Sequence, residues 1–526
     1  MQQPTPESVL HPAASGATRA AVREGRALLA LCLAIVLLYG LRLGALDFWA
    51  PDEPRYGAIA EELRSLRHGP AGLVLLRLND APYTQKPPLY FWLAALAGGP
   101  AGHVDELAAR LPSAAAALGC VALTWLVGRW LLADPTAALL AAGLLATSFR
   151  FAFTARRVQL DALLTLCELA AIALFLWLEL RRGGLGQARR RPGVIATLHL
   201  ALGAAALAKG PVGWLPLAVF AGYLGWQGRL RELRAITPPW SWLLSIGPLL
   251  VWITLAALLA PPGFAERAVG ENLIGRFFAG SSHARPFYYY AYQLPLDFLP
   301  WTLLLPAGAL RVWHAARGGP TAGAGTGSDS PSAASRFLLV WIALPLLFFS
   351  LSAGKRGLYL LPIFPALALV TAAWAGGLGA ASESRLRPAR SLARLIFAVG
   401  VIELSLFSLG LPLLDPEKSP RPIAEAAAAE LASDERIGIY DLRPLEGGIA
   451  YYGRRRIASL QTPEELRGFA EAGGRRVIMR QRHLARWEGP PRLARIGEFR
   501  RGRRRIAVTR IQAPDDEIPE GKKNRP

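Results

Sequence analysis

The sequence predicts a mostly α-helical protein that crosses a membrane about 11 to 13 times and ends in a small soluble α/β domain. Three observations support this fold class. The 526 residues are 52% hydrophobic and only 18% charged, whereas about 25% is typical of a soluble domain. Several apolar stretches reach about 20 residues, the length that a helix needs to cross ~30 Å of hydrocarbon. The tail from residue 415 onward holds no such stretch.

Windows of apolar residues give the expected spans. They lie near residues 27–46, 110–132, 135–149, 158–180, 194–208, 211–227, 240–260, 294–314, 336–352, 357–379 and 392–414. Residues 88–99 are equally apolar but too short to cross a bilayer. We therefore expect an interfacial or re-entrant helix there.

Charge gives the expected orientation. In a soluble protein, the net charge of +21 would suggest a nucleic-acid partner. In a chain of membrane spans, basic loops on the cytoplasmic side explain this charge instead. We therefore expect no nucleic-acid partner. Short cytoplasmic loops collect Lys and Arg. With the N-terminus inside, the basic loops at 181–192, 228–239, 311–336 and 380–394 all fall on the cytoplasmic side. This predicts a multi-pass protein of a bacterial inner membrane.

The predicted spans and their orientation divide the chain into three parts. Residues 1–26 form a cytoplasmic segment, residues 27–414 the transmembrane domain with a large first periplasmic loop at 47–109, and residues 415–526 a periplasmic α/β domain. In this tail, short β-rich runs alternate with helix-like stretches. The expected strands are 436–440, 475–479 and 505–510, and the expected helices are 423–432 and 463–472.

Two adjacent carboxylates, Asp52 and Glu53, follow the first span directly. A carboxylate at that boundary can lie in a half-apolar cleft, where its basicity is tunable. The alternative is a solvated loop or a helix N-terminus, which attracts acidic residues through the helix dipole. A third acid, Asp161, stands at the outer start of a later span.

Positive charges stand on the outer face, against the usual bias. Lys86 precedes two prolines, which suits a fixed charge for a phosphate; a snorkelling lysine is the alternative. The other outer cations are Arg150, Arg156, Arg157, Lys209, Lys355 and Arg356, with Arg276 and Arg285 as additions. Together they predict a site for an anionic lipid head group, with contact to bulk phospholipid as the alternative.

The ordered set of motifs resembles the polyprenyl-phosphate-dependent glycosyltransferases of the GT-C fold. Within these, the chain is most similar to the bacterial group that includes the aminoarabinose transferase acting on lipid A, which is related to protein O-mannosyltransferases. The motifs are Pro51 to Tyr56, Gln85 to Leu89, Arg156 to Asp161, Lys209 to Pro211, Arg285 to Tyr289 and Lys355 to Pro362. They extend over about nine tenths of the chain, and their order carries the resemblance.

The resemblance implies an integral membrane enzyme. It would transfer a sugar from a polyprenyl (undecaprenyl) phosphate donor to lipid A, another glycan or a protein in the periplasm. Asp52 would be the catalytic carboxylate, with Glu53 beside it and Asp161 as the second acid. The expected substrate-binding residues are Lys86, Arg285 and Lys355 for the phosphate, Tyr83 and Tyr359 beside the head group, and Gln85, Arg156, Arg157, Lys209 and His283 around them.

One departure concerns a metal ion. Many relatives carry Glu at the position of Gln85, and that Glu has been considered a metal ligand together with a histidine resembling His283. A neutral amide is a poor zinc ligand, and by itself His283 reads as a polar loop residue. We therefore expect no metal ligand set and no required cofactor, with a divalent metal as the alternative.

A second class of function competes with the enzyme. A transporter or flippase for an anionic lipid or lipid-linked sugar would place charges near the bilayer midplane, often in two related halves. This chain shows no internal repeat, and its acids and cations gather at one face. A membrane-anchored binding protein, the third class, leaves Asp52, Lys86 and Asp161 without a role. The grouping of acids and cations at one face therefore favours an enzyme that acts at the membrane surface.

Overall fold

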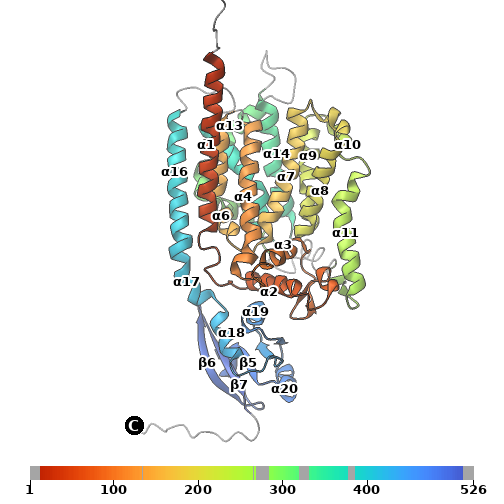
Figure 1. Cartoon of the computed structure of the whole chain (residues 1–526), viewed down its shortest axis with the longest axis vertical. Helices are drawn as coiled ribbons and strands as arrows, with labels where there is room; N and C mark the ends of the chain where they lie inside the picture. Colours follow the sequence, from red (N-terminus) through yellow and green to blue (C-terminus); the bar gives the residue numbers. More distant parts are fainter. Residues whose placement is uncertain are drawn as a thin grey trace, which may run out of the picture.

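The computed structural model describes residues 12–132, 134–264, 266–267, 270, 284–318, 331–376 and 386–512. Long helices run side by side in a bundle, and a small sheet domain hangs from one end of it (Figure 1). The predicted fold class, a mostly helical membrane protein with a C-terminal α/β domain, is confirmed.

The bundle is built from helices that match the expected spans. They are α1 (Pro12–Gly40), α4 (Glu106–Leu131), α5 (Pro135–Ala146), α7 (Leu160–Arg181), α8 (Pro192–Lys209), α9 (Leu215–Trp226), α11 (Ser241–Leu259), α13 (Leu305–Arg317), α14 (Pro331–Leu351), α15 (Phe364–Gly376) and α16 (Leu386–Ser405). Among the described residues, 7 helices are long and apolar enough to cross a membrane, or 8 if one bent pair counts as a span. Shorter helices such as α9 and α13 lie alongside them in Figure 1.

Two expected spans are interrupted. The stretch at 135–149 ends as α5 and turns by 66° into α6 (Phe149–Ala155). The stretch at 294–314 divides into α12 (Tyr289–Asp297), a short 3-10 turn (Trp301–Leu303) and α13. Prolines 295, 300 and 306 explain the second division, because each lacks the N–H that a continuous helix needs.

The loop after α1 folds into a layer, which we call the outer layer, across the lower end of the bundle and beside the C-terminal domain (Figure 1). It comprises α2 (Asp52–Arg64), a 3-10 turn η1 (Pro70–Leu73), a hairpin of β1 (Arg77–Leu78) and β2 (Ala81–Pro82), and α3 (Leu89–Gly98). At ten residues, α3 is a short apolar helix, as expected for 88–99. Tyr56 of α2 packs edge-on against Phe91 of α3, with ring centroids 5.5 Å apart.

The tail begins with α17 (Leu411–Lys418) and α18 (Arg421–Ala428) and forms one five-stranded sheet within the described residues. Its order is β4 (Ile457–Leu460), β3 (Ile437–Tyr440), β5 (Arg476–Arg480), β7 (Arg504–Ile511) and β6 (Leu493–Arg501). The three predicted strands correspond to β3, β5 and β7. The predicted strands did not include β4 or β6. Most residues of β6 are exposed or half-buried, and it carries little apolar alternation.

Contacts between α19 (Glu446–Gly453) and α2 bring the tail domain onto the outer layer. A Cβ added at Gly447 would lie 2.6 Å from Arg55 Cα, so the two backbones touch. The Tyr452 hydroxyl donates to Glu106 at 2.7 Å and accepts from the Phe48 N–H at 2.7 Å. The tail is therefore fixed directly beside the residues that begin α2.

Candidate active site

A cavity of about 260 Å³ lies where the outer layer meets the bundle. Its walls come from the start of α2, the segment that follows the hairpin, the start of α7, the end of α8 and the loop before α15. The lining residues are Asp52, Arg55, Tyr56, Gln85, Lys86, Gln159, Leu160, Asp161, Lys209, Arg356, Leu358 and Tyr359. Segments more than 300 residues apart in the chain thus share one cavity.

Asp52 is the first residue of α2, and its side chain is 14% exposed. Arg356 Nη2 lies 3.2 Å from one carboxylate oxygen, and Arg55 Nη1 lies 3.7 Å from the other. Burial lowers the pKa of Arg356, but the Asp52 carboxylate outweighs burial and the pKa of Arg356 rises above its ordinary value. Asp52 is thereby presented to the cavity between two fixed cations.

Asp161 and Lys209 form the opposite wall. Lys209 Nζ donates a hydrogen bond to Asp161 Oδ1. The same ammonium lies 4.6 Å from the ring centroid of Tyr359, within range of a cation–π contact. Lys209 ends α8, and Gly210 follows with φ of +87°, a conformation that glycine adopts without strain. This break turns the chain at the cavity wall.

Gln85 and Lys86 enter the cavity from the segment after the hairpin. Tyr83 lies behind them, only 5% exposed, with its ring 6.1 Å from that of Phe91. Its N–H donates to Leu76 O at 2.8 Å, which ties the segment to the residue directly before β1. Of the expected donor-binding residues, the structure thus brings Gln85, Lys86, Lys209 and Tyr359 together with Asp52 and Asp161.

The cavity walls carry an excess of positive charge. Among the described residues, four cations (Arg55, Lys86, Lys209 and Arg356) face two carboxylates (Asp52 and Asp161). A bound phosphate would offset this excess. The arrangement can therefore hold an anionic group next to a carboxylate, which is the combination that displacement of a phosphate from a sugar requires.

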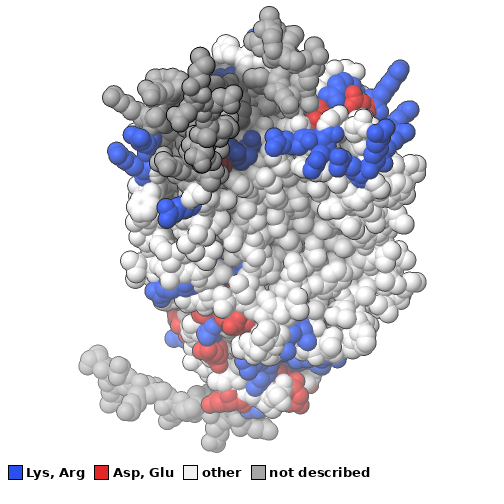
Figure 2. Space-filling model, turned by 45° about the horizontal axis from the view of Figure 1, so that its top comes forward, with Lys and Arg blue, Asp and Glu red and all other residues white. Residues whose placement is uncertain are grey.

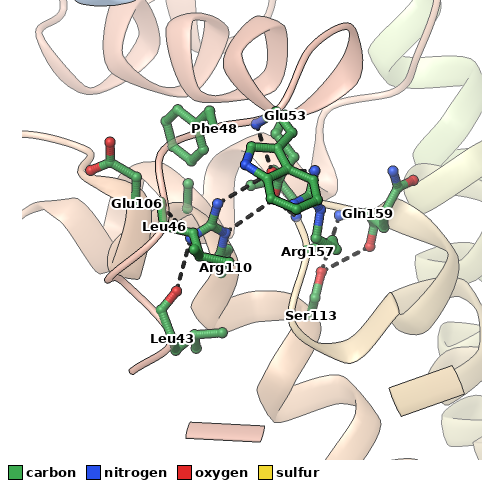
Figure 3. Close-up of polar contacts among 12 residues, drawn as sticks. Leu43, Leu46, Phe48, Glu53, Glu106, Arg110, Ser113, Arg157 and Gln159 are labelled. Carbon is green, nitrogen blue, oxygen red and sulfur yellow. Dashed lines mark hydrogen bonds and ion pairs between the residues drawn. The ribbon is translucent and has the colours of Figure 1, made fainter. Parts of the chain in front are cut away.

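Glu53 lies outside the cavity, at the centre of a buried network (Figure 3). The side chains of Glu53 and Arg110 are 1% and 2% exposed, and Arg110 Nε donates to Glu53 Oε1 at 3.0 Å. Arg157 Nη2 lies 2.7 Å from Glu53 Oε2. The N–H groups of Trp49 and Val158 donate to the same carboxylate at 3.0 and 2.9 Å. Burial would raise the pKa of Glu53, but the two guanidiniums outweigh it and hold the pKa below 4.5.

The network joins the start of α2 to the loop that leads to Asp161. Arg110 also donates to the carbonyls of Leu43, Leu46 and Asp47, at 2.8–2.9 Å. Ser113 exchanges hydrogen bonds with the backbone of Gln159, donating to its carbonyl at 2.9 Å and accepting from its N–H at 3.2 Å (Figure 3). Both acids of the cavity are thereby held by α4.

Three other expected residues, Arg156, Arg285 and Lys355, are not among the residues that line the cavity. Arg156 donates to the carbonyls of Leu38 and Leu41 at 2.6 and 2.8 Å. Lys355, 4% exposed, donates to the carbonyls of Arg285 (3.1 Å) and Ser352, and burial lowers its pKa. The Arg285 guanidinium lies 6.0 Å from the Tyr289 ring centroid. His283 and Arg276 lie outside the described residues.

The expected set missed several lining residues, most notably Arg55 and Arg356. Arg55 carried a signal, because it stands one helical turn after Asp52, at a spacing that pairs side chains. The sequence analysis predicted both Lys355 and Arg356 as cations of the outer face. No local pattern indicated which of the two faces the cavity. Gln159, Leu160 and Leu358 lie within the motifs Arg156 to Asp161 and Lys355 to Pro362, but their residue types did not mark them as lining residues.

A family model and the sequences of known relatives both match this chain. The model of the dolichyl-phosphate-mannose-protein mannosyltransferase family matches residues 26–265. An undecaprenyl phosphate-alpha-4-amino-4-deoxy-L-arabinose arabinosyl transferase of Pseudomonas paraeruginosa is 31% identical over 413 residues, which cover 76% of this chain and 67% of the relative. The enzyme of the same name from Pectobacterium carotovorum is 32% identical over 398 residues, 72% of this chain and 64% of that relative. The chain thus spans about two thirds of these relatives.

Solved structures agree in fold. ArnT from Cupriavidus metallidurans bound to undecaprenyl phosphate superimposes with a TM-score of 0.70 at 18% identity, covering 92% of this chain and 98% of that one. The oligosaccharyltransferase AglB from Archaeoglobus fulgidus gives 0.56 at 13% identity, over 87% and 69%. The resemblance expected from the motifs is confirmed, and it favours the enzyme over the transporter. The chain belongs to the GT-C glycosyltransferases of the protein mannosyltransferase family, in the group of the bacterial undecaprenyl phosphate-aminoarabinose arabinosyl transferases.

Proposed function

We propose that this glycosyltransferase moves 4-amino-4-deoxy-L-arabinose from undecaprenyl phosphate to lipid A at the periplasmic face of a bacterial inner membrane. The names of the aligned relatives support the donor. The lipid A acceptor follows from the motif resemblance. We assign the reaction to the cavity around Asp52.

One observation carries this proposal. A carboxylate, Asp52, stands among fixed cations in a cavity at the end of an apolar bundle. A polyprenyl chain would remain in the hydrocarbon while its phosphate met Lys86, Arg356 and Lys209, because these charges lie where the bundle ends. Such preorganised cations stabilise charge as it develops on a departing phosphate.

The proposed reaction exchanges one bond for another at the anomeric carbon. The bond from that carbon to the donor phosphate oxygen breaks, and undecaprenyl phosphate leaves with the electron pair. An acceptor oxygen forms the new bond. If that oxygen belongs to a hydroxyl, Asp52 takes its proton as general base. If it belongs to a lipid A phosphate, little deprotonation is needed and Asp52 positions the acceptor.

The distribution of charge supports an N-terminus on the cytoplasmic side. Figure 2 shows Lys and Arg gathered round the end of the molecule that faces the viewer, above a broad band with few charges. The C-terminal domain and the cavity layer belong to the opposite end (Figure 1). Under the positive-inside rule the basic end faces the cytoplasm, which would make the cavity periplasmic.

Substitution of the cavity residues tests the proposal. In proteoliposomes with undecaprenyl phosphate-aminoarabinose and lipid A, we expect Asp52→Asn to lower transfer by about 100-fold or more, the scale of general-base catalysis. Lys86→Ala is expected to lower it by about 100-fold, since one phosphate-stabilising donor is lost. Mass spectrometry of lipid A gives the product.

Matched controls are available in the tail domain. Asp441→Asn removes a carboxylate whose side chain is 47% exposed, and Lys418→Ala removes an exposed lysine. Both should transfer at the wild-type rate. Full activity in Asp52→Asn protein with a wild-type melting temperature would refute the assignment of this cavity.

A further inference from the structure

A second cluster of titratable side chains lies in the outer layer, away from the cavity around Asp52. Glu62 near the end of α2, His68 after that helix and Asp80 in the hairpin turn bring three ligating atoms within 4.8 Å of one another. His68 Nε2 lies 3.3 Å from Asp80 Oδ1 and 3.8 Å from Glu62 Oε2. Around a tetrahedral zinc ion with bonds of about 2.1 Å, neighbouring ligand atoms lie about 3.4 Å apart.

The hairpin turn holds two of these side chains in position. Asn79 and Asp80 have φ of 57° and 65°, as in a two-residue turn of type I′. Their N–H groups donate to Glu62 Oε1 at 2.5 Å and to Glu62 Oε2 at 3.4 Å. Arg456 Nε lies 2.7 Å from Asp80 Oδ2, which leaves Asp80 Oδ1 facing His68. The cluster is thus assembled by backbone geometry.

Two of the three atoms lie 3.3 Å apart as an ion pair but lack a hydrogen bond. His68 Nε2 and Asp80 Oδ1 are buried and make no hydrogen bond within the described part of the chain. Buried polar atoms normally have partners, and a cation bound among the three side chains would supply one.

We propose that Glu62, His68 and Asp80 bind one zinc ion. An imidazole with two carboxylates is a ligand set that suits zinc. Glu62 and Asp80 also line a cavity of about 1040 Å³ between the outer layer and the tail domain, so the fourth position would be open to water. This set is distinct from Gln85 and His283, and no step of sugar transfer is assigned to it.

The site lies where the hairpin binds the tail domain. The Asn79 side chain donates to Ile457 O at 2.7 Å and accepts from Ile457 N–H at 2.8 Å. Arg456, beside it, pairs with Asp80. A zinc ion would therefore fix the hairpin to α2 and, through the hairpin, hold the tail domain on the outer layer.

Zinc binding by the full-length chain tests this inference. After removal of any affinity tag and dialysis against a chelator, wild-type protein is equilibrated with zinc and its zinc content is measured by mass spectrometry. We expect one equivalent that His68→Ala loses, with a zinc-dependent rise in melting temperature that His68→Ala also loses. Asp80→Asn should weaken binding at least tenfold, and it keeps the turn, because Asn adopts positive φ readily.

Two histidine variants serve as controls. His103 is exposed and lines the same large cavity. The His103→Ala protein should therefore still bind one equivalent of zinc, and so should the His283→Ala protein. Wild-type protein that binds no zinc would overturn the inference and leave His68 as an ion-pair partner of the two carboxylates. Retention of the zinc by both His68→Ala and Asp80→Asn, or its loss in His283→Ala alone, would overturn it as well.

Discussion

At the first turn of α2, adjacent carboxylates have different roles. Consecutive residues of a helix point about 100° apart, so Asp52 faces the cavity while Glu53 points into the bundle toward Arg110 and Arg157. The sequence grouped the two as a pair. Their separation is a consequence of where α2 begins and of what packs against each side.

We expect the buried carboxylate of Glu53 to contribute to the stability of the fold and not directly to sugar transfer. Glu53→Gln leaves two buried guanidiniums without their counter-charge, and loss of one partner in such a pair costs about 3–5 kcal/mol. We expect a lower melting temperature in detergent, with a loss of transfer that follows the folded fraction. A wild-type melting temperature would contradict the structural role of Glu53.

The pH dependence of this effect has a definite sign. The pKa of Glu53 is lowered from 4.5 in the folded protein. Its contribution is therefore fully present above about pH 4.5 and is lost as the pH falls through the lowered value. The difference in melting temperature between wild-type and Glu53→Gln protein should be large at pH 7 and should shrink below pH 4.5.

The neighbours Lys355 and Arg356 offer a similar contrast. Arg356 faces Asp52, whereas Lys355 binds backbone carbonyls. Arg356→Ala should lower kcat/KM about 10- to 100-fold with little change in melting temperature, because it removes a phosphate-stabilising charge. Lys355→Ala should mainly lower the melting temperature. The reverse result in parallel kinetic and unfolding measurements would show that Lys355 is the ligand.

At the scale of elements, the docking of α19 on α2 depends on close backbone approach. Gly447→Ala should loosen this contact, since its Cβ would lie 2.6 Å from Arg55 Cα. We expect a lower melting temperature and at least a threefold loss of transfer through displacement of Arg55. Gly468→Ala in α20 (Pro463–Glu471) is the control, because a Cβ there meets nothing within 4 Å. Equal behaviour of the two variants would argue against a tight α19–α2 contact.

Hydrophobic windows located the elements but not their breaks. The stretch at 135–149 carries no charged residue, yet it bends by 66° between α5 and α6, at Thr147 and Ser148. The Phe149 N–H, at the start of α6, donates to Leu299 O at 3.0 Å, a partner 150 residues away. A hydropathy average over a short stretch contains no information about a partner so distant in the sequence. The bend could therefore not be predicted from hydropathy.

At the scale of the whole molecule, the proposed orientation can be measured directly. In a background with Cys32, Cys120 and Cys167 replaced by Ser, a membrane-impermeant maleimide should label Gly468→Cys in intact spheroplasts. Gly186→Cys, in the basic loop after α7, should be labelled only after permeabilisation. Both sites are exposed. Labelling with the opposite sidedness would place the cavity in the cytoplasm and contradict the proposed orientation.

From the amino-acid sequence we could predict the membrane class, most of the spans, the three strands β3, β5 and β7, and the motifs that carry Asp52, Lys86, Asp161 and Lys209. These features depend on local hydropathy and residue type, which a short window contains. The folded arrangement was needed to show that Glu53, Arg156 and Lys355 make their contacts away from the cavity, that Arg356 reaches Asp52, and that Glu62, His68 and Asp80 converge. Each of these outcomes depends on side-chain direction and on contacts between elements, and a local pattern specifies neither.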